Sequence, residues 1–161
     1  MSDFAIKLEP IVVNLTPHAL ARTSEAFYNA AERVEDKEIW TFKYFLYCGS
    51  IEIGIKAIIL AKDNSKEMKE LLKSKRKGFG HNLIALVQRL EQIGEGQLLD
   101  HKSKGTIAMI NSFYKDKGLE YFTQDVIFES TSGSKGIPSI LELKKVSEKV
   151  IGFLVRKSYF S

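Results

Sequence analysis

Glu52 and Lys56 are the first residues whose types and spacing could carry chemistry. They lie four residues apart in the order Glu then Lys, which places both side chains on one face of a helix as a favourable ion pair. Such a pair can exchange protons with a substrate, line a binding groove, or join two packed surfaces. A partly buried structural pair is the more common role, and a place in a ligand groove stays open beside it.

A second candidate is a basic stripe that continues into the next segment. Its members recur at helical spacing and are Lys62, Lys66, Lys69, Lys73 and Arg76. The stripe could follow a phosphate backbone, and we take Lys66, Lys69 and Lys73 as candidate ligand-binding residues. Glu67 and Glu70 dilute its charge, and no aromatic side chain stands among the lysines for base stacking. A solvated helix face is therefore the alternative interpretation.

Other chemistry-bearing patterns are absent from the sequence. The three histidines, at positions 18, 81 and 101, have no Cys, His or carboxylate partner at ligand spacing, so we expect no metal site and no cofactor. No Gly-x-Ser-x-Gly elbow and no Cys/His nucleophile pattern occurs. The polar loop at 130–138 is similar to an anion-binding loop ahead of a helix. It lacks the Gly-Lys-Ser/Thr step, which favours a plain surface loop.

The elements that must position these residues are predicted to be helices. No proline occurs between positions 18 and 137, which favours long helices. Thr16 before Pro17 and Ser139 three residues before Glu142 are helix-start signals. Hydrophobic spacing predicts helices at about 17–35, 38–63, 65–77, 82–93 and 103–116, and a last one that Ser139 caps.

The apolar run 42–61 contains only three charged residues, Lys43, Glu52 and Lys56. A helix that is apolar on all sides has no face left for water, so it is predicted to be the central helix of a bundle. The run is long enough to span a membrane. Glu52 and Lys56 near its middle would each cost about 2.5–3.5 kcal/mol there, so we expect no membrane association. Cys48 inside the run suits a buried free thiol and a cytoplasmic protein.

Two segments favour extended backbone. Residues 4–15 carry alternating and β-branched residues, and residues 121–128 include Val126, Ile127 and Phe128; the two could form one short two-stranded pairing. Hydrophobic residues make up 44% of the chain, enough for a core without a metal or disulfide. The prediction is one all-α domain over 1–161, an antiparallel bundle of four to six helices.

Two motifs carry a resemblance to a known family. The segment 50–57 holds Glu52 and Lys56-Ala57, and some twenty residues later comes Gly80-His81-Asn82-Leu83. Over about residues 38–93 the chain resembles the HEPN superfamily of small helical domains. The resemblance implies an antiparallel bundle of four or five helices and frequent dimerisation. Some relatives are metal-independent ribonucleases of defence and toxin systems, and others look non-catalytic.

The resemblance also implies a candidate catalytic pair. Ribonuclease members carry an Arg and a His separated by four to six residues, and Arg76 and His81 fit that spacing. His81 would act as general acid and base, and Arg76 would stabilise the phosphorane charge. The last helix, where the pair might be sought, has Arg156 and no following His. Alternatively, His81 fixes the entry to the helix that Asn82 caps.

The function predicted from these observations is a HEPN-like, non-catalytic binding module, homodimeric, for a nucleotide, an RNA or a partner protein, in a defence or toxin–antitoxin context. A net charge of +4 and a pI near 9.0 are compatible with an anionic partner. Glu52, Lys56 and His81 join the three lysines as candidate ligand-binding residues. The alternatives are a metal-independent endoribonuclease that uses Arg76 and His81, and a purely structural interaction protein.

Overall fold

Every regular element that the computed structural model describes is a helix. It describes residues 15–35, 40–74, 78–116 and 137–159. The elements are α1 (Pro17–Arg33), α2 (Trp40–Lys62), α3 (Lys66–Lys73), α4 (Leu83–Gln92), the 3-10 helix η1 (Gly96–Leu98), α5 (His101–Lys115) and α7 (Ile140–Arg156). The predicted all-α class is confirmed. The predicted strand pairing of 4–15 with 121–128 lies, apart from Leu15, outside the described residues.

The helix starts follow the capping residues seen in the sequence. The Thr16 hydroxyl accepts a hydrogen bond from the Ala19 amide at 3.1 Å. The Asn82 side chain accepts from the Ala85 amide at 3.1 Å, so α4 begins at Leu83 as predicted. Ser139 and Glu142 form a reciprocal capping box at the start of α7. Each cap satisfies amides that have no partner within the helix.

Helix α3 is shorter than predicted. It ends at Lys73 with Ser74 as its C-cap, whereas the sequence predicted a helix to Lys77. The Phe79 amide donates to the Leu71 carbonyl at 3.2 Å, so Phe79 lies against the last turn of α3. A carbonyl satisfied in this way does not need a further helical turn.

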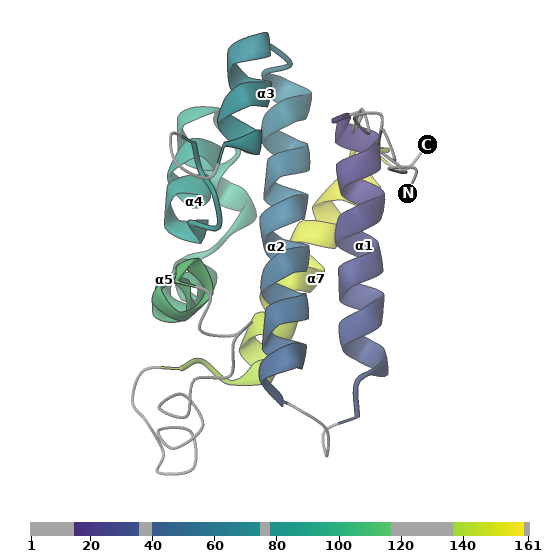
Figure 1. Ribbon diagram of the computed structural model, residues 1–161, viewed down its shortest axis with the longest axis vertical. Coiled ribbons are helices and arrows are strands. Elements are labelled where there is room, and N and C mark those ends of the chain that lie inside the picture. The colour runs from purple at the N-terminus through teal and green to yellow at the C-terminus, as the bar shows by residue number, and fades with distance from the viewer. Residues whose placement is uncertain (1–14, 36–39, 75–77, 117–136, 160–161) are drawn as a thin grey trace, which may run out of the picture.

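Helix α2 is the centre of the fold. It contacts α1, α3, α4 and α7, and Figure 1 shows it between α1 and α4 with α7 behind. Ile51, Ile55 and Ile58 have no exposed surface. By length and composition alone the stretch Thr41–Lys62 could cross a membrane, but 72% of its most apolar window is buried inside the protein. Burial by neighbouring helices is what an all-round apolar helix requires.

Two glycines on α2 let the neighbouring helices approach closely. A Cβ built on Gly49 would stand 2.5 Å from Cδ1 of Phe27 on α1, and one built on Gly54 would stand 2.4 Å from Cγ1 of Val150 on α7. Both distances are below any real carbon–carbon contact. The absence of side chains at these two positions therefore forms notches that seat one residue from each partner helix.

Three buried serines lock α1, α2 and α7 together. The Ser24 hydroxyl donates to the Ser50 carbonyl at 2.7 Å, and the Ser147 hydroxyl donates to the Ser50 hydroxyl at 2.7 Å. All three side chains have no exposed surface. Buried hydroxyls that satisfy one another avoid the desolvation cost of an orphaned polar group.

Candidate functional site

Glu52 lies at the centre of a buried polar cluster, defined here as Glu52, Lys56, His81 and Tyr114. Lys56 Nζ donates to Glu52 Oε1 at 2.5 Å and to the Gly80 carbonyl at 3.0 Å. On the other carboxylate oxygen, Oε2, the Tyr114 hydroxyl donates at 2.5 Å and His81 Nδ1 lies at 2.9 Å. Glu52 is 4% exposed. A buried carboxylate is tolerated only with such a set of partners.

The partners decide the charge of this carboxyl group. Burial by itself raises the pKa of Glu52, but the contacts with His81, Lys56 and Tyr114 lower it, and the net pKa lies below the ordinary glutamate value. Hydrogen bonds and a nearby cation favour the charged form. Glu52 is therefore ionised at neutral pH, as a buried anion held by three side chains.

The polar cluster ties three parts of the chain together. Glu52 and Lys56 stand on α2, His81 precedes α4, and Tyr114 stands on α5. The His81 ring meets the Tyr114 ring edge-on, with centroids 5.6 Å apart. The cluster thus fixes the start of α4, one residue before the cap at Asn82. The His81 side chain is still 27% exposed, and a carboxylate beside one imidazole nitrogen orients the ring as in proton-transfer pairs.

The predicted ligand-binding residues separate into two groups. Glu52, Lys56 and His81 come together in the polar cluster, and the predicted Glu52–Lys56 pairing is confirmed. Lys66 and Lys73 are exposed on α3 and Lys69 is half-buried there. These three lysines are not among the residues that line four hollows, of about 330 to 460 Å³ each, on the part of the chain that the structure describes. Arg76 lies outside the described residues, so its relation to His81 stays a prediction.

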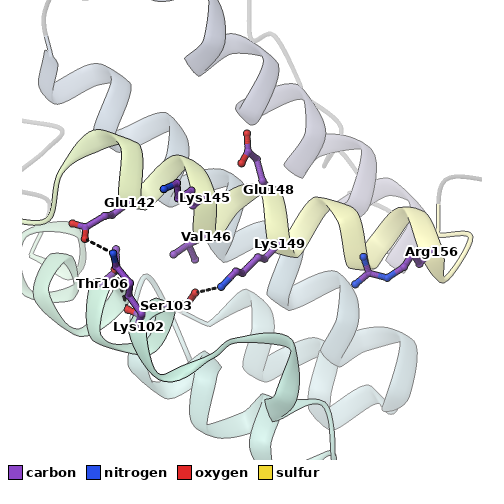
Figure 2. A pocket seen from close by; sticks show the side chains of 9 residues that line it. All are labelled: Lys102, Ser103, Thr106, Glu142, Lys145, Val146, Glu148, Lys149 and Arg156. Atoms are coloured by element: carbon purple, nitrogen blue, oxygen red, sulfur yellow. Dashed lines mark hydrogen bonds and ion pairs between the residues drawn. The ribbon is translucent and has the colours of Figure 1, made fainter.

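A surface hollow between α5 and α7 is the second candidate site, named here the α5–α7 groove. It has a volume of about 460 Å³. Figure 2 shows its lining side chains, three from α5 and six from α7. They are Lys102, Ser103, Thr106, Glu142, Lys145, Val146, Glu148, Lys149 and Arg156. Four of these are cationic and two are carboxylates, so the lining carries a net charge of +2 at neutral pH.

Ion pairs within the protein neutralise only some of the cations that line the groove. Lys149 Nζ contacts Asp100 at 2.6 Å and Ser103 at 2.9 Å, across the groove floor. The Asp100 pKa is held below its ordinary value by the bonds from Lys149 and Ser103. Lys102 and Glu142 form a looser pair at 3.4 Å. These pairs hold α5 against α7.

The remaining cations of the groove are available to a ligand. Lys145 and Arg156 form no ion pair or hydrogen bond with any other described residue. Glu148 accepts from the Tyr28 hydroxyl of α1 at 3.1 Å, and in Figure 2 it projects from the opposite side of α7 to Lys149. Its negative charge is therefore directed away from the groove floor.

A second hollow of about 460 Å³ adjoins the groove near the end of α7. It is lined by Gln97, Leu98, Asp100, Lys149, Phe153, Arg156 and Lys157. Lys149 and Arg156 line both hollows. The ammonium of Lys157 sits 5.6 Å from the centre of the Phe153 ring, a cation–π distance. The cationic surface thus continues along α7.

Sequence reasoning missed the α5–α7 groove and one member of the polar cluster. Lys145, Lys149 and Arg156 are spaced by four and seven residues, which places them on one helix face; this was the available signal. Tyr114 gave no comparable signal, because its meeting with Glu52 depends on how α5 packs against α2. Among the described residues, no group of three His, Cys, Asp or Glu side chains is placed to hold a metal ion.

Comparisons with known proteins found no match for this chain. No family model matches the chain, and neither a curated protein nor a solved structure matches it. The function is therefore argued from the two sites themselves.

Proposed function

We propose that this protein is a non-catalytic helical module that binds a phosphate-bearing ligand, a nucleotide or an RNA, in the α5–α7 groove. The observation that carries the proposal is the pair of cations, Lys145 and Arg156, that face the groove without a partner among the described residues. Cations that no internal carboxylate neutralises attract phosphate and release counterions when it binds. The guanidinium of Arg156 can also contact a phosphate through two parallel bonds.

The test is a matched pair of double variants titrated with a fluorescently labelled uridine hexanucleotide. Lys145→Ala with Arg156→Ala removes two charges from the groove, and Lys66→Ala with Lys73→Ala removes two charges from α3. We expect the groove variant to bind about tenfold or more weakly, and its salt slope to fall by roughly 1.4 for two lost single-strand contacts. Equal losses in both variants, or binding lost only in the α3 variant, would refute the groove as the site.

The resemblance to the HEPN superfamily remains part of the proposal. The meeting of Glu52, Lys56 and His81 supports it, because the residues of both motifs form one contact set. With it come the antiparallel arrangement of the bundle, the homodimer, the cytoplasmic location and the defence or toxin–antitoxin context. Light scattering coupled to gel filtration tests the dimer, with a single monomer mass as the contrary outcome.

A metal-independent ribonuclease is the second candidate function. The observation that favours it is the partly exposed His81 ring held at Nδ1 by a buried carboxylate, an arrangement suited to proton transfer. Incubation of RNA with the purified protein in EDTA separates the two candidates. The binding module leaves the RNA intact, whereas cutting that His81→Gln abolishes in a folded protein would establish the enzyme.

A further inference from the structure

A glycine in the middle of α7 has no packing explanation. Gly152 lies well inside the helix Ile140–Arg156, where glycine is less favourable than alanine because its backbone loses more freedom. A Cβ built on Gly152 meets only Arg156 Nη1, at 3.5 Å, an ordinary contact distance. At Gly49 and Gly54, by contrast, a Cβ would collide with a neighbouring helix. A missing side chain at 152 therefore serves no helix–helix contact.

Gly152 lies on α7 between two residues that each line both hollows. Lys149 comes three residues before it and Arg156 four residues after it, so both flank it on one face of the helix. These are the two residues that line both the α5–α7 groove and the adjoining hollow. Because Gly152 has no side chain, the Arg156 guanidinium lies close over the helix there, with Nη1 3.5 Å from the position that a Cβ would take.

We infer that the ligand is a single strand of RNA that crosses α7 at Gly152 and lies in both hollows. This inference rests on the proposed binding function and names its ligand. The cations from Lys145 to Lys157 span roughly 18 Å at the helical rise of about 1.5 Å per residue. That length is more than a mononucleotide can cover.

The chemistry of the track favours recognition of the backbone over the bases. Phe153 is the one aromatic residue among the described residues that line the two hollows, and it is 8% exposed with Lys157 over its ring. It offers no open face on which a base could stack. The strand is therefore held through its phosphates by Lys145, Arg156 and Lys157, with little preference for sequence.

Ligand length tests the strand directly. The full chain is titrated with 5′-UMP and with a uridine hexanucleotide at the same salt concentration. We expect the hexanucleotide to bind at least about tenfold tighter and with the steeper salt dependence, because it engages more cations. Suppose both probes bind equally and the Lys145→Ala, Arg156→Ala variant binds neither. The groove is then the binding site, but its ligand is not an RNA strand. If neither probe binds, both proposals fail.

The crossing point is tested with Gly152→Ala and a matched control, Gly105→Ala. Gly105 is an exposed glycine within α5, whereas Gly152 is half-buried, and a Cβ at Gly105 meets no atom within 4 Å. Both variants should raise the thermal unfolding midpoint, since alanine favours the helix. Only Gly152→Ala should weaken hexanucleotide binding, by about fivefold or more, because its methyl group would lie against the Arg156 guanidinium and hinder a phosphate from reaching it there. Unchanged affinity in Gly152→Ala, or an equal loss in Gly105→Ala, would overturn the crossing at this residue.

Discussion

The polar cluster around Glu52 and the α5–α7 groove both combine carboxylates with cations, but their charges meet different partners. In the cluster one buried carboxylate takes contacts from Lys56, His81 and Tyr114. In the groove Lys145 and Arg156 have no partner among the described residues. The difference shows where this fold uses charge for its own stability and where charge is left for a ligand. It predicts that mutations in the polar cluster lower the stability of the fold, whereas mutations in the groove weaken ligand binding and leave stability nearly unchanged.

The largest effect is expected from Glu52→Ala. The substitution removes the buried carboxylate that accepts from Lys56 and from the Tyr114 hydroxyl, and breaking such a buried pair costs about 3–5 kcal/mol. Chemical denaturation measures the loss of unfolding free energy. Glu67→Ala, at an exposed position on α3, is the control and should change it by less than about 0.5 kcal/mol. Similar values for the two variants would mean that the cluster contributes nothing to stability.

Tyr114→Phe removes one contact of the cluster and keeps the ring. The tyrosine hydroxyl donates to an ionised carboxylate, and bonds of that kind contribute about 1.5–3 kcal/mol. We expect a destabilisation in this range, again by chemical denaturation. Tyr28→Phe is the matched control, because its hydroxyl bonds the exposed Glu148 and its loss should cost less. A larger loss in Tyr28→Phe would reverse the comparison.

The contribution of the polar cluster to stability should depend on pH, because Glu52 becomes protonated in acid. Its pKa in the folded protein is lowered below the ordinary value of 4.5, so its contribution to stability is complete above that value. The contribution is lost as the pH falls through the folded-state pKa. The stability difference between the wild type and Glu52→Gln should therefore shrink as the pH falls below 4.5. A difference that stays constant with pH would contradict an ionised Glu52.

The smallest change in stability is expected in the groove. Lys145→Ala with Arg156→Ala removes two exposed cations that have no partner among the described residues, and should alter the unfolding free energy by less than about 0.5 kcal/mol. The same variant carries the largest loss of ligand binding. Thermal melts beside the hexanucleotide titration test both statements. A strongly destabilised variant would show that these cations serve the fold instead of a ligand.

Local signals in the sequence predicted most of the helices. Thr16, Asn82 and Ser139 mark helix starts because a cap depends only on residues a few positions away. The apolar run around Ile55 predicted a central helix for the same reason, since no face was left for water. The end of α3 was predicted too late, because the Phe79 amide bonds back to Leu71 and no short-range pattern encodes that contact.

The sites were harder to predict than the helices. The Glu52–Lys56 pair follows from spacing on one helix, and it was found. The contacts of Glu52 with His81 and Tyr114 join residues far apart in sequence, so they depend on helix packing. The α5–α7 groove likewise depends on helix packing, because it is lined by Lys102 of α5 and Lys149 of α7, which are far apart in sequence. Attention to the α3 lysines came from their density in the sequence, which says nothing about whether a hollow lies beside them.

The notches at Gly49 and Gly54 also bear on the order in which the protein can fold during synthesis. Phe27, which seats at Gly49, belongs to the helix made just before α2, so that contact can form early. Val150, which seats at Gly54, is made much later. Until it emerges from the ribosome, the side of α2 that α7 covers stays open to water, and exposed apolar surface promotes aggregation. A nascent chain that has not reached α7 is therefore the form of this protein most in need of a chaperone.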